Sequence, residues 1–219
     1  MPMAATEIKR GRKFDQVLAG AREVFLRDGF DGASMDEIAR VAGVSKATLY
    51  SYFADKRLLF QEVARLECNR QAAEAQAVIG TDAPPEVALP QIARRVVAFV
   101  LSDFGFDIYR ISVAESDRFP ELGRRFYDSG PALLRALLND YFTAAIARGE
   151  LAIDDIDLAA DQFAELCKAD LFPRRICGVG SRPNEAEIAR VVNGAVAMFL
   201  ARYATRIQTR GGSGRLASL

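Results

Sequence analysis

Histidine is absent from this chain of 219 residues, and its absence removes the commonest kinds of catalytic and metal-binding site. Ser-His-Asp and Cys-His catalysis need an imidazole base, and many zinc and iron sites need imidazole ligands. The three cysteines, Cys68, Cys167 and Cys177, are odd in number and far apart, with no CxxC pair. This spacing indicates reduced thiols rather than a disulfide framework. We therefore expect no enzymatic activity, no cofactor and no metal.

Membrane spans and a net charge are also missing. No apolar run approaches the length of a membrane span, and the first residues lack the apolar core of a signal peptide. Basic and acidic residues both number 29, so the net charge says nothing for or against a polyanionic partner. Half of the residues are hydrophobic, which is enough for a sizeable core. These features predict a folded, cytoplasmic protein with no membrane partner.

Helical periodicity runs through almost the whole chain, whereas alternating strand patterns and fixed-period repeats do not occur. Four helices are expected within the first 79 residues, the first of them over about residues 12–28. The segment from Gly80 to Pro85, which ends in paired prolines, predicts a boundary between helices. Further helical stretches are expected near 86–104, 106–116, 119–148 with a break at Gly130-Pro131, 156–177 and 185–208. The sequence therefore predicts an all-α fold.

Residues 34–53, SMDEIARVAGVSKATLYSYF, have the pattern of a helix-turn-helix. Ser34 and Glu37 have the spacing of a capping box, and Ser45 can cap the second helix. Gly43 suits the left-handed backbone that ends the first helix. The apolar residues expected to face inward are Ile38, Ala39, Leu49 and Phe53.

The second of these helices would present small, hydroxyl-bearing and basic side chains to solvent. Lysine reaches guanine acceptors or phosphate, alanine leaves room for a thymine methyl group, and hydroxyls donate to phosphates. The candidate DNA-binding residues are Ser34, Ser45, Lys46, Ala47, Thr48, Tyr50, Ser51, Tyr52 and Lys56. The basic residues from Lys9 to Lys13 are either a solvated terminus or, beside such a motif, a flexible arm that touches phosphate.

The segment GASMDEIARVAGVSKATLYSYFADKRLLF closely resembles the DNA-binding domain of the TetR family of bacterial regulators, and its TLYxYFxxK run is the most telling part. The resemblance implies that the second helix reads an operator. Lys46 and Ala47 then lie where bases are approached. The residues at positions that hold the phosphate backbone are Thr48, Tyr50, Tyr52 and Lys56.

Later segments resemble the AefR-like class of C-terminal domains of the same family. The matching stretches are Arg118 to Leu122, Phe126-Tyr127, Gly130-Pro131 and Arg148 to Leu151. The resemblance implies no metal or catalytic residue and names no effector. It divides the chain into a DNA-binding domain over 1–56, a helical ligand-binding and dimerisation domain over 57–208, and a disordered tail over 209–219. The first helix of the second domain would join it to the DNA-binding domain.

The second domain is expected to hold both a ligand cavity and a dimer interface. Its aromatic residues are numerous enough to line a cavity, although each is also an ordinary core residue by type. The candidate ligand-binding residues are Phe104, Tyr109, Phe126, Tyr127, Phe142, Phe163 and Cys167. The family pairs its last two major helices across a two-fold axis. The candidate interface residues are Val192, Ala195, Phe199 and Tyr203.

Taken together, these patterns predict a homodimeric transcriptional regulator that binds double-stranded operator DNA. It would act as a repressor that a small apolar or aromatic effector releases from its operator. One alternative is an enzyme or small-molecule carrier with an ancillary DNA-binding module, in which carboxylates of the second domain serve acid–base chemistry. Another is a constitutive DNA-binding protein, which would need no cavity.

Overall fold

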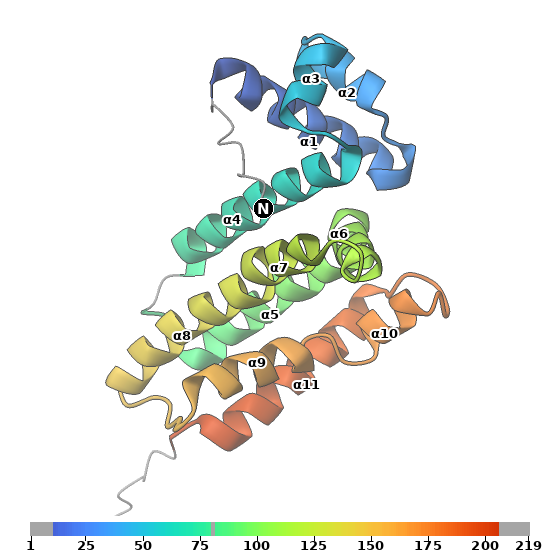
Figure 1. Ribbon diagram of the computed structural model, residues 1–219. Coiled ribbons are helices and arrows are strands. Elements are labelled where there is room, and N and C mark those ends of the chain that lie inside the picture. Colours follow the sequence, from blue (N-terminus) through green and yellow to red (C-terminus); the bar gives the residue numbers. More distant parts are fainter. Residues whose placement is uncertain (1–10, 80–81, 206–219) are drawn as a thin grey trace, which may run out of the picture.

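A computed structural model describes residues 11–79 and 82–205, and apart from one isolated bridge between Leu151 and Ala204 the elements in these ranges are helices. The helices are α1 (Arg12–Gly32), α2 (Met35–Ala42), α3 (Lys46–Tyr52), α4 (Lys56–Ile79), α5 (Pro85–Leu101), α6 (Asp103–Glu115), α7 (Pro120–Ser129), α8 (Pro131–Ala147), α9 (Ile156–Leu166), α10 (Leu171–Ile176) and α11 (Glu185–Tyr203). Figure 1 shows α1 to α3 at one end, which we call the head. Helix α4 runs beneath it, and α5 to α11 form the remaining part, which we call the body. In the described ranges, no helix has the combined length and apolarity that a bilayer crossing requires.

The head is held together by α1, which buries one apolar face against α2 and α4. Val17, Ala21 and Val24 recur at helical spacing, and all three are fully buried. Gly20 lies on the same helix at a very close approach to α2, because a Cβ atom added there would lie 2.7 Å from the Ala42 backbone nitrogen. Only glycine, which has no Cβ atom, therefore allows α1 and α2 to pack this closely.

The turn between α2 and α3 forms as the sequence predicts. One difference from the prediction lies at the start of α2. Gly43 has φ 64°, and the following Val44 N–H donates to Ala39 O at 3.1 Å, which closes the end of α2. Ser34 accepts a hydrogen bond from the Glu37 N–H at 3.1 Å. The Glu37 carboxylate, however, binds arginine side chains instead of the Ser34 N–H. The predicted capping box is therefore only half formed, because the arginines offer charged donors.

The head shares its hydrophobic core with α6 of the body. Three α6 residues, Phe104, Ile108 and Ile111, belong to the same buried cluster as the inner faces of α1 to α4. The Phe104 ring meets that of Phe60 on α4 edge-on, with centroids 5.4 Å apart. Head and body are thus joined by packing and not only by the α4 connection.

The body packs α5, α8, α9 and α11 around a second core of its own. Two of its helical stretches end earlier than the sequence pattern indicates. The stretch expected over 156–177 ends at Leu166 and resumes as α10 after Asp170, whose φ of 64° interrupts the helix. Helix α11 ends at Tyr203, where the Ala152 N–H donates to the Tyr203 carbonyl at 2.8 Å. The predicted tail over 209–219 lies outside the described residues.

Candidate nucleic-acid interface and ligand cavity

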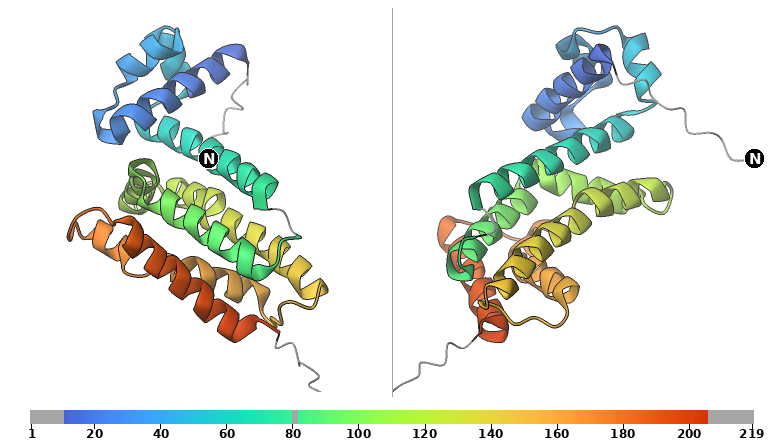
Figure 2. Two further views of the ribbon diagram at one scale, coloured as in Figure 1. Left: turned by 180° about the vertical axis from the view of Figure 1, so that it is seen from behind. Right: turned by 90° about the vertical axis from the view of Figure 1, so that its left-hand side faces the viewer.

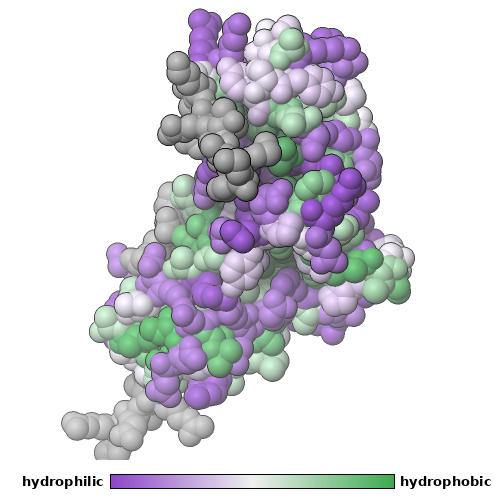
Figure 3. Space-filling model, viewed as in Figure 1, coloured by the Kyte–Doolittle hydropathy of each residue, from purple (hydrophilic) through white to green (hydrophobic). Residues whose placement is uncertain are grey.

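The predicted DNA-binding residues of α3 lie together on the outer side of the head. Leu49 is fully buried beneath α3, whereas Lys46, Ala47, Tyr50 and Ser51 are exposed. Ser34 and Ser45, which cap α2 and α3, are exposed beside them. Figure 3 shows that the surface at this end of the molecule is mainly hydrophilic or neutral. The arrangement leaves a polar helix face uncovered by protein, as major-groove binding requires.

Several of these side chains already have polar partners in the free protein. Lys46 Nζ lies 2.6 Å from Asp36 Oδ2, but both side chains are more than half exposed. Such an ion pair is weak in water, so a phosphate can displace the carboxylate. Ser51 donates to the Thr48 carbonyl at 2.6 Å. Tyr52 is half-buried, and its ring meets that of Phe14 edge-on with centroids 5.5 Å apart.

Lys56 does not join this exposed row, because its side chain is half-buried and bonded within the protein, and its predicted phosphate contact stays a prediction. Its ammonium donates to the carbonyls of Phe30 at 2.6 Å and Ala33 at 2.8 Å. It also lies 4.3 Å from the centroid of the Phe30 ring. Burial lowers the pKa of the lysine. We therefore assign Lys56 to holding the end of α1 against α4. Of the predicted basic arm, Arg12 and Lys13 are exposed, while Lys9 and Arg10 lie outside the described residues.

Replacing Lys56 by methionine should lower the stability of the protein by about 1–3 kcal/mol, because two partly buried carbonyls lose a charged donor. Urea denaturation followed by circular dichroism measures this change. The salt dependence of DNA binding should stay the same, since no phosphate contact is lost. In the matched variant Lys13→Met, the stability should stay the same and the salt dependence of DNA binding should become shallower. A shallower salt dependence in Lys56→Met, with unchanged stability, would show that Lys56 contacts phosphate instead.

Polar contacts reinforce the joint between the head and α6. The Phe30 N–H donates to Asp107 Oδ2 at 3.1 Å, and Arg110 pairs with Asp31 at 2.7 Å. On the same helix, Gly105 and Tyr109 line a cavity in the body. Helix α6 therefore touches both the cavity and the end of α1.

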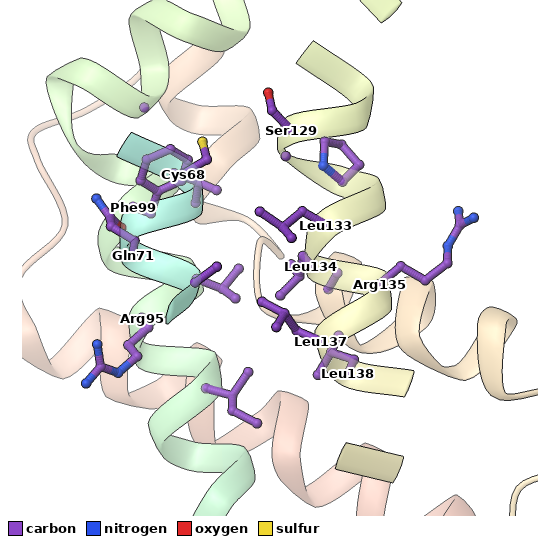
Figure 4. A pocket seen from close by; sticks show the side chains of 18 of the residues that line it. Cys68, Gln71, Arg95, Phe99, Ser129, Leu133, Leu134, Arg135, Leu137 and Leu138 are labelled. Atoms are coloured by element: carbon purple, nitrogen blue, oxygen red, sulfur yellow. The ribbon is translucent and has the colours of Figure 1, made fainter. Parts of the chain in front are cut away.

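The cavity has a volume of about 970 Å³ and lies between α4, α5 and α8, with further wall residues from α6, α7 and α9. Figure 4 shows Leu133, Leu134, Leu137 and Leu138 of α8 facing the other wall, which carries Cys68 and Gln71 of α4 and Phe99 and Arg95 of α5. Such a volume is large enough for a drug-sized molecule. The presence of the cavity also argues against the alternative of a constitutive DNA-binding protein, which would need none.

Three of the predicted ligand-binding residues, Tyr109, Phe126 and Tyr127, do line the cavity. The Tyr109 ring packs edge-on against Phe126 and Phe172, with centroids 6.0 and 4.9 Å away. The other predicted residues are core residues and do not line it. These are Phe104 in the core shared with the head, and Phe142, Phe163 and Cys167 in the core of the body. They pack between helices because aromatic residue type alone does not distinguish a cavity wall from a core.

Sequence reasoning missed the leucine wall of α8 and the contribution of α4. Leu133, Leu134, Leu137 and Leu138 recur at i, i+1, i+4 and i+5, which is a broad apolar face. That spacing was available in the sequence, but it is equally typical of core packing. Cys68 and Gln71 carried no comparable signal. Burial raises the pKa of the Cys68 thiol to about 11, so the thiol stays protonated in the cavity wall.

A buried carboxylate links the cavity wall to the head. Glu67 of α4 is only 4 % exposed, and its Oε2 accepts from Arg22 Nε of α1 at 2.7 Å. Its Oε1 accepts from Gln71 Nε2 at 3.2 Å, and Arg70 donates to both oxygens. Burial opposes the charge, but the bonds from Arg70, Arg22 and Gln71 outweigh it and lower the pKa of Glu67 to about 2. Glu67 is therefore ionised throughout the neutral range. No cluster of Cys, Asp or Glu that could hold a metal ion occurs in the described part of the chain.

The predicted dimer residues are also mostly buried within the chain itself. Val192, Ala195 and Phe199 are at most 3 % exposed, and Phe199 stacks on Phe142. Tyr203 is half-buried and donates to Gln162 Oε1 at 2.9 Å. The first three residues are therefore unavailable to a second chain. The outer face of α11, seen in Figure 2 (left), is uncovered and carries Gly194, Ala197, Met198 and Ala201.

The comparisons with known proteins cover the head and the body separately and together. Residues 17–63 match the family model of bacterial regulatory proteins of the tetR family. Residues 87–205 match the C-terminal domain of AefR-like transcriptional repressors. Together the two models account for most of the described residues.

Curated relatives match over only part of the chain. The transcriptional activator FasR of Mycolicibacterium smegmatis is 45% identical over 56 residues, which is 26% of each chain. The transcriptional repressor AcnR of Corynebacterium diphtheriae is 33% identical over 73 residues, or 33% of this chain and 37% of AcnR. The chain thus aligns with about a quarter to a third of the length of these relatives.

Solved structures match over nearly the whole chain. A TetR-family regulator from Mesorhizobium loti MAFF303099 is 31% identical with a TM-score of 0.78, and the match covers 91% of this chain and 100% of that one. The flavonoid-responsive regulator FrrA is 35% identical with a TM-score of 0.62, covering 90% and 100%. The chain therefore belongs to the TetR family, and it is a DNA-binding transcriptional regulator and not an enzyme.

Proposed function

We propose that this regulator is a repressor whose affinity for its operator falls when a neutral, apolar or aromatic molecule occupies the cavity of the body. The observation that carries the proposal is the course of α4. This one helix begins at the head, where Lys56 holds the end of α1, and continues into the cavity wall with Cys68 and Gln71. A molecule that moves the wall therefore also moves the head, which shifts the population of DNA-binding conformations.

The charges in the cavity wall support a neutral effector. Most charged wall residues pair with one another: Arg70 with Glu74, Arg135 with Asp161, and Lys168 with Glu165. Paired charges leave little net field for an ionic ligand. Aromatic and aliphatic side chains supply most of the remaining wall. FrrA, which is 35% identical, is named as responsive to flavonoids, and these are aromatic molecules.

We further propose a homodimer that forms through the outer face of α11 and acts in the cytoplasm. Gly194, Ala197 and Ala201 leave room for a second helix to approach closely, and Met198 is 62% exposed at the edge of this face. A two-fold axis would hold the two copies of α3 about one duplex turn, roughly 34 Å, apart. In each half-site we assign Lys46 and Ala47 to bases, and phosphate contacts to the hydroxyls of Ser34, Ser45, Thr48, Tyr50, Ser51 and Tyr52.

Binding of effector and operator should be reciprocal. A compound that lowers operator affinity must bind the operator complex more weakly by the same factor, which corresponds to a coupling of about 1–3 kcal/mol. Native mass spectrometry of protein purified from cells identifies a retained compound. Calorimetric titration of that compound, with and without an operator duplex selected from a random pool, measures the coupling. Equal affinities in the two titrations would reject release by that compound.

A further inference from the structure

The polar groups of the cavity wall differ in whether the protein already uses them. Ser102 Oγ donates to the Phe99 carbonyl and accepts from the Gly105 N–H, and Ser129 Oγ donates to the Arg125 carbonyl. The Tyr141 hydroxyl donates to the Ala83 carbonyl at 2.8 Å. These groups are satisfied within the chain, so they add shape to the wall but little hydrogen-bonding capacity for a ligand.

Gln71 differs because only its nitrogen is used. A carboxylate only accepts hydrogen bonds, so the Nε2 group of Gln71 must face Glu67 Oε1, 3.2 Å away. This requirement sets the orientation of the amide by chemistry. Within the described part of the chain, the Gln71 carbonyl oxygen accepts no hydrogen bond, and the residue lines the cavity beside Cys68 and Phe99. The wall therefore holds an oriented acceptor that remains available to a ligand.

We propose that the Gln71 carbonyl oxygen selects effectors that carry a hydroxyl group, and that Glu67 acts as its positioning residue. The proposal rests on the cavity being the effector site. A phenol or alcohol donates to this oxygen, whereas the corresponding methyl ether cannot. An aromatic body fits the leucine wall of α8 and the rings of Tyr109 and Phe126. The effector class is then a neutral hydroxylated aromatic molecule.

The test compares a trihydroxyflavone with its three mono-O-methyl ethers by calorimetric titration of the full-length protein. One ether should bind wild-type protein about tenfold more weakly than the parent, because the bound ether displaces water from the Gln71 oxygen and leaves this acceptor unpaired. In Gln71→Met, which keeps the length of the side chain, the difference should shrink to less than about twofold. The control Ser129→Ala removes a wall hydroxyl that the protein already uses, and it should keep the full difference.

Several results would overturn the assignment. They are failure of the trihydroxyflavone to bind, equal binding of the parent and all three ethers, and discrimination that persists in Gln71→Met. Loss of discrimination in Tyr109→Phe instead would transfer the role to the Tyr109 hydroxyl. The operator complex is measured separately by fluorescence anisotropy. Discrimination through Gln71 without any loss of operator affinity would reject effector release but keep the ligand assignment.

Discussion

Replacing Gly20 by valine should abolish operator binding, with a loss of affinity of at least about a hundredfold. The Cβ atom would lie 2.7 Å from the nitrogen and 2.8 Å from the Cα of Ala42, and these backbone atoms cannot move without displacing α2. Glycine inside a helix normally lowers stability, by about 1 kcal/mol relative to alanine. Here the close approach outweighs that preference, because overpacking costs about 1–3 kcal/mol even for small additions.

The measurement is fluorescence anisotropy with an operator duplex selected by the wild-type protein, together with thermal unfolding. The control is Gly32→Ala at the end of the same helix, where the added Cβ would meet only the Asp28 side chain at 3.4 Å. This variant should bind like wild type. Wild-type affinity in Gly20→Val would show that the spacing of α1 and α2 does not position α3.

Replacing Ala197 by arginine should convert the proposed dimer into a monomer and weaken operator binding by at least about a hundredfold. In a two-fold interface each substitution appears twice, so two long cationic side chains would meet across the axis. Unpaired charges in a desolvated interface cost several kcal/mol. A monomer also reads only one half-site, which leaves too few contacts for specific binding.

Analytical ultracentrifugation gives the oligomeric state of the variant. Ala114→Arg is the matched control, since Ala114 is an exposed alanine on α6, away from the outer face of α11. It should stay dimeric. If Ala197→Arg were dimeric and Ala114→Arg monomeric, the interface would lie on α6. Phe199, which the sequence pattern indicates as an interface residue, is unsuitable for this test because a charge there would disrupt the core of the protomer.

The helix-turn-helix could be predicted from sequence because its signals are local. Gly43 ends α2 and Ser45 caps α3 through hydrogen bonds within a few residues, so the sequence contains all that is needed. The break after α9 could not be predicted in the same way. The apolar periodicity continues across it, and Asp170, with φ 64°, is not a residue whose type demands that conformation.

The site residues show the same contrast between local and non-local information. Leu49 faces inward and Tyr50 outward because helical geometry alone decides it. Lys56 was expected on the DNA surface, but its partner carbonyls belong to Phe30 and Ala33, more than twenty residues earlier. Similarly, Phe142 and Phe163 are core residues because helices distant in sequence cover them. The type of a residue indicates neither which groups it will bind nor which residues will pack against it.

The packing of α6 into the head limits how these regulators can be recombined. Phe104, Ile108 and Ile111 complete the core beneath α1 and α4, so a DNA-binding segment transplanted without them would expose apolar surface. A chimera that joins this head to the body of a relative therefore has to carry a matching α6 face. If α3 reads the operator as proposed, operator specificity should be exchangeable by substituting a few exposed residues of that helix. Joining the head of one regulator to the body of another at the start of α4 is therefore not sufficient to exchange the whole head.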